Sequence, residues 1–479
     1  MTAEQKTTTP SKVNVATLMV ALLSACVAFQ LNASMLSPAL ATIQRELHTD
    51  AASVGLTQTA FFTSAALFSL FLPRLGDNVG RKRVLTGMLV VMGVGCAVAA
   101  LAPNIGVLFV GRVIQGVSGP VVPLCLIMLR VEVRDPKLYG TLMGVLTAIN
   151  GGIAGVDALG GGYLAEHHGF GAVFWTMAVV AGLAALSMLF FSRESTAEKT
   201  ERMDWLGVLL IVISVGALLV ALDELGKLAA ANWVLVIVLL VVTAVAFWLF
   251  WRVEDRGQHP LVATHLLRRR ATWSLLLTTL LTMTGVFAVM NGLIPNLAQD
   301  SSGGYRMAAG VAALWTLTPY ALAGLLMGPL SGWMAATFGY RRILRIGMAG
   351  SVATIALMML VVGSSSRLLL LAVSLLLGIT YAGIGNIILN GLGIVLSPKE
   401  NQGFLPGLNA GAFNLGAGLS FAVIFGVETA TGGANGTGPS GYYGGLTAGL
   451  VILLLALAAS FLIPRPVGAE LGAPERTPA

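Results

Sequence analysis

Long apolar runs, repeated along almost the whole chain, limit the folds open to this sequence more than any other feature. Charged residues make up 10% of the 479 positions and hydrophobic residues 56%, whereas about a quarter of a typical soluble chain is charged. Runs of about 20 apolar residues are long enough to cross the hydrocarbon core of a bilayer as α-helices. The sequence therefore predicts an all-α polytopic membrane protein.

The apolar runs predict fourteen transmembrane helices, with bounds good to a few residues. A six-helix bundle at 15–191 and another at 272–463 would flank two additional helices within 192–271, and residues 1–14 and 464–479 would be cytoplasmic tails. The fourteen helices are expected at 15–40, 51–73, 84–102, 107–130, 138–163, 171–191, 205–222, 233–251, 272–297, 308–335, 343–362, 368–396, 403–427 and 442–463.

The distribution of basic residues predicts the orientation of these helices. With a cytoplasmic N-terminus, 23 of the 28 Lys and Arg residues fall on cytoplasmic segments. Because cytoplasmic loops of membrane proteins are enriched in basic residues, both termini are expected inside the cell. The net charge of +7 then reflects topology, and no nucleic-acid partner is expected.

A short charged stretch recurs in the two halves of the chain. Pro73–Arg83 separates helices 2 and 3, Gly328–Arg342 separates helices 10 and 11, and each has a glycine shortly before a basic pair. Loops of glycine and arginine can recur by coincidence, but the matching positions favour a repeat, and two six-helix halves around a central site form a known transporter architecture. Both stretches are expected to be cytoplasmic hinges, with a conformational switch made of Asp77, Gly80, Arg81, Lys82, Arg341 and Arg342.

These stretches resemble motifs of the major facilitator superfamily, specifically of its fourteen-helix drug:proton antiporter branch. Residues 73–83 are similar to the superfamily loop motif G-x-L-x-D-R-x-G-R-[RK]-x, with Pro73 and Asn78 in place of its first glycine and first arginine. Arg112–Gly119 is similar to R-x-x-Q-G-x-G. The resemblance implies a secondary transporter in which the 73–83 loop controls conformational switching.

Two further motifs of the antiporter branch are altered in this chain. Gly151–Gly162 resembles a motif ending G-P-x-x-G-G, with Asp157 and Ala158 where Gly-Pro is usual. Residues 31–34 resemble L-D-x-T, with Asn32 in place of the acid. The acid that the family would use for proton coupling in helix 1 is therefore missing.

Arg112 and Asp157 are the charged residues that lie well inside predicted helices. Counting 1.5 Å per residue from the helix ends places Arg112, Asp157 and Asn32 at a similar depth in the membrane. Intramembrane charges are costly and often mark proton relays. We interpret Asp157 as a titratable carboxylate that pairs with Arg112 and releases it on protonation; a static salt bridge is the alternative interpretation.

Polar residues on predicted helices 1, 4, 9 and 12 are candidates for lining a central substrate cavity. Asn386 and Asn390 are four residues apart and share a helix face. Hydrogen bonding between helices would explain each of these amides as well. The candidate set is Gln30, Asn32, Gln115, Asn291, Asn386 and Asn390.

The expected function is proton-coupled efflux of amphipathic or cationic small molecules by a monomer in a bacterial plasma membrane. A uniporter, a proton symporter of a metabolite and a lipid flippase are the alternatives on the same fold. No catalytic motif such as GxSxG, HExxH or a P-loop occurs in the sequence, so neither an enzyme nor an ATP-driven pump is expected. Cys26, Cys96 and Cys125 have no metal-binding spacing, and no metal or cofactor is expected.

Overall fold

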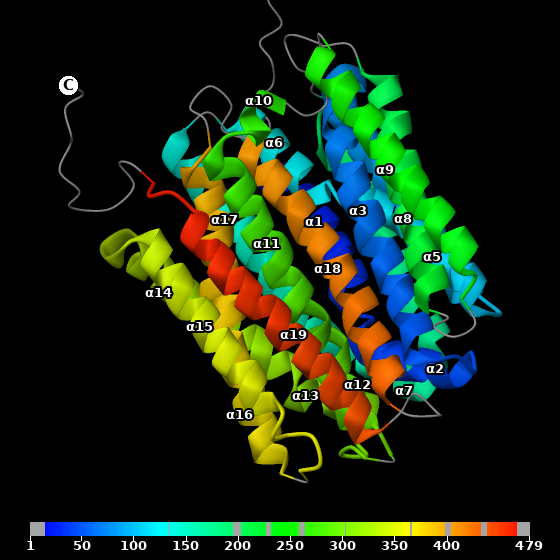
Figure 1. The fold of residues 1–479 in the computed structure, drawn as a ribbon. Coiled ribbons are helices and arrows are strands. Elements are labelled where there is room, and N and C mark those ends of the chain that lie inside the picture. Colours follow the sequence, from blue (N-terminus) through cyan, green and yellow to red (C-terminus); the bar gives the residue numbers. More distant parts are fainter. Residues whose placement is uncertain are drawn as a thin grey trace, which may run out of the picture.

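The structure is a computed structural model that describes residues 15–133, 135–194, 203–226, 231–257, 264–301, 303–364, 366–397, 404–432 and 438–466. Within these ranges all regular elements are helices, and the long helices run side by side along the long axis of one bundle (Figure 1). The predicted all-α fold is confirmed. The tail 1–14, most of the tail 464–479 and most of the linker after residue 194 lie outside the described residues.

The N-terminal half, residues 15–191, is built from helices of which several are interrupted. One is the continuous segment α7, whose backbone leaves helical geometry at Gly169 (φ 77°, ψ 172°), so it comprises two helices. The elements are α1 (Val15–Ser34), η1 (Ser37–Ala39), α2 (Leu40–Glu46), α3 (Ala51–Val79), α4 (Arg81–Ala100), α5 (Ile105–Gln115), η2 (Gly116–Ser118), α6 (Val121–Glu132) and α7 (Pro136–Phe191).

A helical hairpin follows, made of α8 (Trp205–Gly226) and α9 (Trp233–Arg256), with the short α10 (Thr264–Leu267) after it. The hydroxyl groups of Ser214 and Thr243 each donate to the backbone carbonyl of the other residue, at 3.0 and 3.3 Å. The hairpin lies beside α3 at one side of the bundle (Figure 1), and most side chains of α9 are exposed. An exposed apolar helix of this kind is typical of a lipid-facing surface.

The C-terminal half, residues 272–463, contains two π-helical segments, η4 and η5, within otherwise regular helices. Such π-bulges are frequent at functional sites. The elements are α11 (Arg270–Ala288), η4 (Val289–Leu293), α12 (Ile294–Gln299), α13 (Ala309–Trp315), α14 (Leu317–Phe338), α15 (Tyr340–Met358), α16 (Arg367–Leu377), η5 (Gly378–Gly385), α17 (Asn386–Val395), α18 (Phe404–Thr431), α19 (Pro439–Ala459) and η6 (Ser460–Leu462).

By length and hydropathy, twelve helices in the described part of the chain are long and apolar enough to cross a membrane, against the fourteen predicted. Two segments account for the difference. The twelve include 153–191 as one span, although Gly169 divides this segment into two helices. They leave out α15, whose first six residues include Arg341, Arg342 and Arg345. The number fourteen is therefore not confirmed and stays a prediction.

The structure places the two related stretches at equivalent turns and narrows their extent. Gly80 joins α3 to α4 with φ 120° and ψ 125°, and Gly339 joins α14 to α15 with φ 94° and ψ 132°. Positive φ angles of this kind favour glycine. The expected hinge loop at Pro73–Arg83 is wrong in its extent, because α3 continues as a helix to Val79 and the turn is confined to one glycine.

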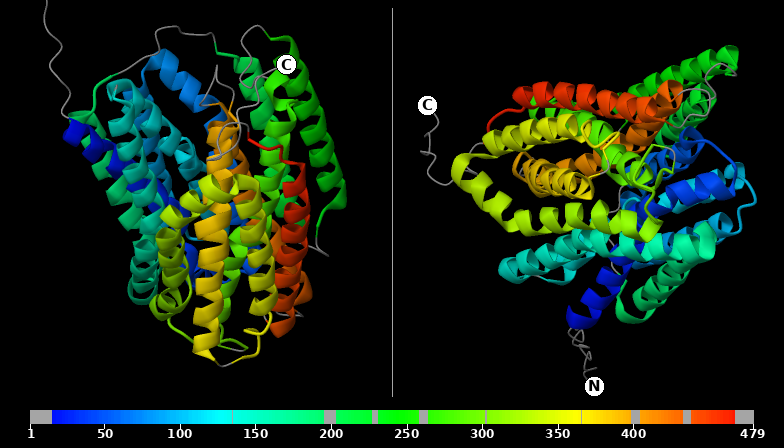
Figure 2. Two further views of the ribbon diagram at one scale, coloured as in Figure 1. Left: turned by 90° about the vertical axis from the view of Figure 1, so that its left-hand side faces the viewer. Right: turned by 90° about the horizontal axis from the view of Figure 1, so that it is seen from below.

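We call the end of the bundle with Gly80–Arg83 and Gly339–Arg342 the basic end, and the end with η1 and α2 the far end. The start of α1 and the end of η6 both lie at the basic end (Figure 2). The domain boundaries at 191 and 272 stay a prediction, but contacts between the two halves are well defined. α3 packs against α18, and α7 packs against α13 and α14.

Close contacts between the halves lie toward the far end. Thr59 Oγ1 donates to the Gly418 carbonyl at 2.8 Å, Thr318 Oγ1 donates to the Gly155 carbonyl at 2.9 Å, and Gln299 Nε2 donates to the Pro38 carbonyl at 3.0 Å. A Cβ atom at Gly162 would lie 2.8 Å from the Ala309 carbonyl oxygen and from the Gly310 Cα atom. Toward the far end the two halves are therefore held together by side-chain hydrogen bonds to backbone carbonyls and by close backbone packing at Gly162.

Candidate functional site

Arg112 of α5 is the centre of a buried polar cluster in the N-terminal half. Its side chain is 0% exposed. Nη1 donates to Gln115 Oε1 at 2.6 Å and to the Asn32 carbonyl at 3.3 Å, and Nη2 donates to Gln58 Oε1. The guanidinium carbon lies 4.2 Å from the centre of the Phe61 ring, a cation–π distance. The buried charge is therefore solvated by amide dipoles and an aromatic face.

Asp157 of α7 lies in a second buried group, next to α1. Its Oδ2 accepts a hydrogen bond from Ser34 Oγ, and Ser34 Oγ accepts one from Gln30 Nε2 at 2.9 Å. Asp157 is 5% exposed and Ser34 is 6% exposed. The side chains of Gln30, Ser34 and Asp157 thus form a chain of hydrogen bonds between α1 and α7.

The expected ion pair between Arg112 and Asp157 is not formed. Arg112 bonds to amides and a carbonyl, and Asp157 bonds to Ser34, although α1 touches both groups through Asn32 and Ser34. The depth count from the sequence brought these residues to one level, as the structure does. The depth count does not determine which side chains form hydrogen bonds with each other. The coupling role of Arg112 and Asp157 stays a prediction.

Four polar atoms of these groups are buried without a hydrogen-bond partner among the described residues: Arg112 Nε, Gln58 Nε2, Gln115 Nε2 and Asp157 Oδ1. An unpartnered buried donor or acceptor costs about 1–3 kcal/mol. Three of the four are donors, and a polar solute with carbonyl or hydroxyl oxygens would satisfy them. The group around Arg112 therefore has more N–H donors than acceptors to pair with them.

The remaining predicted cavity residues lie in different places. Asn32 accepts from Cys96 Sγ at 3.2 Å and donates to the Ala28 carbonyl at 3.0 Å, so it joins α1 to α4. Asn291 lies in η4 and donates to the Phe287 carbonyl at 3.0 Å. Asn390 Nδ2 donates to Asn386 Oδ1 at 3.1 Å on α17. The structure therefore groups Gln30, Asn32 and Gln115 near Arg112 and Asp157, and separates them from Asn386 and Asn390.

An aromatic cluster lies where the two halves meet. Phe62 of α3 contacts Phe287 of α11 edge to face, with ring centroids 5.1 Å apart, and stacks on Phe421 of α18 at 6.3 Å. Phe61, which faces Arg112, contacts Phe62 at 4.9 Å. The polar cluster of the N-terminal half is thereby connected to an aromatic wall shared by both halves.

Gln58 and Ser34 are functional candidates that reasoning from the sequence missed. Gln58 is a fully buried amide in the apolar α3, and an intramembrane amide is a signal that could have found it. Ser34 occupies the position of the threonine in the L-D-x-T resemblance. Its bond to Asp157 is long-range and left no signal in the spacing of residues.

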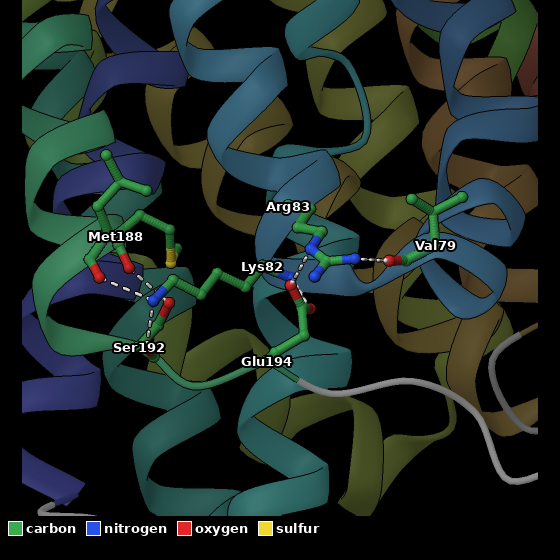
Figure 3. Close-up of polar contacts among 7 residues, drawn as sticks. Val79, Lys82, Arg83, Met188, Ser192 and Glu194 are labelled. Carbon is green, nitrogen blue, oxygen red and sulfur yellow. Dashed lines mark hydrogen bonds and ion pairs between the residues drawn. The ribbon is translucent and has the colours of Figure 1, made fainter.

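Figure 3 shows the basic end of the N-terminal half, where Glu194 lies against the start of α4. The Glu194 carboxylate accepts from the Lys82 backbone N–H at 3.0 Å and pairs with Arg83 at 3.6 Å. Lys82 Nζ donates to the Leu189 and Ser192 carbonyls at 2.7 and 2.8 Å. These bonds attach the end of α7 to the turn at Gly80.

The predicted switch residues of the N-terminal half lie in this turn. Arg81 pairs with Asp77 across it, with Nη2 and Oδ1 2.7 Å apart, and one turn of helix separates the two residues. A carboxylate at a helix N-terminus also stabilises the helix dipole, which is the position that Glu194 takes at α4. The turn is held by charge-assisted bonds, so its rearrangement requires them to break.

Gly80→Ala is expected to destabilise the protein by about 1–3 kcal/mol, because a side chain at positive φ is strained. The new Cβ atom would also lie 2.5 Å from the Glu194 carboxyl group. Thermal unfolding of the purified protein measures this effect. Gly87→Ala on α4 is the matched control, since a Cβ atom there meets nothing within 4 Å; equal melting temperatures for the two variants would contradict the role of the turn.

Comparison with known proteins gives the family. The sequence pattern described as the Major Facilitator Superfamily matches residues 22–421. The chain belongs to this superfamily. It is a multi-pass membrane transporter, and the superfamily fold expected from the motifs is confirmed.

A relative in Lactococcus lactis subsp. cremoris (strain MG1363), described as a uridine/deoxyuridine transporter, is 55% identical over 455 residues, which are 94% of this chain and 95% of the relative. Multidrug resistance protein 3 of Bacillus subtilis (strain 168) is 24% identical over 275 residues, 57% of this chain and 53% of that protein. The solved structure of the nucleoside transporter NupG (D323A mutant) has a TM-score of 0.63 at 13% identity and covers 93% of this chain and 98% of its own.

The expectation of multidrug efflux is wrong. The relative at 55% identity carries a nucleoside transporter's description over nearly its full length, whereas the multidrug relative matches little more than half of either chain. Transporters with different described cargo match this chain, so the loop and helix motifs do not distinguish a drug from a nucleoside. The alternative of a metabolite transporter is the better supported interpretation.

Proposed function

We propose that this protein transports uridine and deoxyuridine across a bacterial cell membrane. The observation that carries the proposal is the 55% identity, over 94% of the chain, to the uridine/deoxyuridine transporter of Lactococcus lactis. Two chains this similar over nearly their whole length have the same residue at more than half of the aligned positions. A difference in substrate class would need changes concentrated in that site.

The chemistry of the site supports a nucleoside. Uridine is neutral, with two base carbonyls and ribose hydroxyls that accept hydrogen bonds from side-chain N–H donors. Arg112, Gln58 and Gln115 have unpartnered N–H groups, and the aromatic rings of Phe62 and Phe287 lie nearby, where the two halves meet. A cationic drug would gain nothing from the guanidinium group of Arg112.

Proton-coupled uptake is the proposed mode of transport, with Asp157 as the coupling carboxylate. Asp157 Oδ2 accepts a hydrogen bond from Ser34, and Oδ1 has no hydrogen-bond partner. Oδ1 is therefore the oxygen that we expect to bind the proton. Protonation would remove the only charge of the Gln30–Ser34–Asp157 chain. Arg112 would then be a binding and positioning residue, separate from the proton site.

The proposed orientation has the basic end in the cytoplasm, both termini inside the cell and fourteen transmembrane helices. The concentration of Lys and Arg at one end supports this orientation. The turns at Gly80 and Gly339 support two related halves within one chain. With both halves in one chain, a monomer is the proposed functional unit.

Asp157→Asn is expected to abolish the pH dependence of uridine uptake. In the parent protein, lowering the external pH raises uptake because protons drive entry; the asparagine keeps a group that can bond to Ser34 but cannot bind a proton. Initial uptake rates at a series of external pH values measure this. Gln30→Asn serves as the control, because it alters the same chain of hydrogen bonds without removing the acid. A retained pH response in Asp157→Asn would contradict the coupling role.

Uptake of labelled uridine by cells that lack their own nucleoside transporters tests the substrate assignment. Cells that produce the protein should accumulate uridine, and unlabelled deoxyuridine should compete with it. Equal accumulation in cells with and without the protein would refute the proposal, whatever the outcome for Asp157.

A further inference from the structure

The two halves of the chain differ at their equivalent turns. In the N-terminal half, Glu194 supplies a carboxylate to the start of α4 and to Arg83. In the C-terminal half, α15 starts in the same way after Gly339 and carries Arg341, Arg342 and Arg345. No ion pair from these arginines to an acid is found in the part of the chain that the structure describes.

Arg341 and Arg345 are four residues apart, so they share one face of α15. The guanidinium carbon of Arg345 lies 4.0 Å from the centre of the Phe461 ring in η6. Arg270, at the start of α11, donates from Nε to the carbonyl of the next residue, Leu462, at 3.0 Å. Arginines from two helices therefore converge on η6.

Three nitrogen atoms of this group are buried and have no hydrogen-bond partner among the described residues: Arg341 Nε, Arg345 Nε and Arg345 Nη2. Like charges one helical turn apart repel each other. An anion with several oxygens would satisfy the donors and offset the repulsion, and the planar guanidinium fork matches phosphate geometry. The arrangement selects a phosphate-type anion.

The surroundings favour an anion carried by a lipid. Phe461 is 57% exposed, and Phe338, which precedes the turn into α15, is 51% exposed. Arginine side chains near the ends of membrane helices extend to the lipid headgroup region, and the exposed rings of Phe461 and Phe338 provide apolar surface beside them. A phosphate bound between these residues would have its acyl chains against apolar surface.

We propose that Arg270, Arg341 and Arg345 bind the phosphate of an anionic phospholipid headgroup at the basic end of the C-terminal half. The bound lipid connects α15, α11 and η6 at the basic end. Conformational change in the C-terminal half then depends on lipid composition, whereas in the N-terminal half it depends on an internal carboxylate.

Thermal unfolding in nanodiscs tests the site. Phosphatidylglycerol added to phosphatidylcholine should raise the melting temperature of the parent protein, and the double variant Arg341→Gln/Arg345→Gln should lose at least half of this rise. Arg342→Gln, an exposed neighbour on the same helix turn, should keep it. An equal response in the parent protein and the double variant would overturn the proposal, as would no response to phosphatidylglycerol.

Two further experiments distinguish a lipid phosphate from other sources of negative charge. Inorganic phosphate added to phosphatidylcholine nanodiscs should leave the melting temperature unchanged; a rise equal to that with phosphatidylglycerol would overturn the assignment to lipid. Glu400 lies outside the described residues, and Glu400→Gln should keep the full response to phosphatidylglycerol. If this variant lost the response as the double variant does, an internal salt bridge would replace the lipid.

Discussion

Arg112→Lys is expected to lower uridine uptake by about tenfold or more while the protein remains in the membrane. Lysine keeps the positive charge but cannot bond to Gln58, Gln115 and the Asn32 carbonyl together, as the guanidinium group does. A hydrogen bond to a charged group contributes about 1.5–3 kcal/mol, and about 1.4 kcal/mol corresponds to a tenfold change in an equilibrium constant. Loss of one such bond from the guanidinium group to uridine would therefore account for the expected change.

The measurement is the initial rate of uridine uptake at equal amounts of membrane-inserted protein. Arg367→Lys is the matched control, because Arg367 is an exposed arginine at the start of α16, and its uptake should equal that of the parent. Near-normal uptake by Arg112→Lys would mean that charge alone matters at this position, and the hydrogen-bonding role of the guanidinium fork would be wrong.

Gly162→Val is expected to reduce uridine uptake by about tenfold or more by preventing closure of the far end. The Cβ atom would lie 2.8 Å from backbone atoms of Ala309 and Gly310, which cannot rotate away as a side chain can. Overpacking of this kind costs about 1–3 kcal/mol. The variant should therefore favour states in which α7 and α13 are apart.

Gly160→Val is the control for this variant, since it lies on the same helix and its Cβ atom meets only the end of Met35, at 3.8 Å. Both variants add the same side chain to α7, so a shared loss of helix stability would affect them equally. Uptake by cells and binding of uridine by the purified proteins should be measured together. Loss of binding as well as uptake in Gly162→Val alone would indicate misfolding and contradict the role in closure.

The fold was predictable from the sequence because its determinants are local. The length of the apolar runs determines the helices, and the two glycines before basic residues determine equivalent turns at Gly80 and Gly339. The extent of α3 was not predictable, because Pro73 indicates a helix end but is accommodated inside α3. Proline is tolerated in membrane helices where neighbouring groups satisfy the freed carbonyl.

The site was predictable in its components and not in its pairing. Counting residues from helix ends placed Asn32, Arg112 and Asp157 at one level, and the structure brings them together around α1. Whether Arg112 meets an acid or an amide depends on the rotation of each helix about its axis, which spacing does not determine. Gln58 is therefore a partner of Arg112 that only the three-dimensional packing reveals.

The substrate class was the largest error. The motifs around Pro73–Arg83 and Arg112–Gly119 indicate the superfamily, and members of one superfamily can carry either a drug or a nucleoside. The residues that we propose to contact the substrate, such as Gln58, Gln115 and Phe62, come from different helices, and their combination leaves no periodic signal in the sequence. Similarity over the whole chain carries that information instead.

Counterflow in liposomes tests the central claim, transport of uridine, most directly. Purified protein is reconstituted into liposomes loaded with unlabelled uridine, and labelled uridine is added outside without any ion gradient. Transient accumulation of labelled uridine, abolished when the liposomes are loaded with a lipophilic cation instead, is the predicted result. Absence of uridine counterflow, together with counterflow of the cation, would contradict the account.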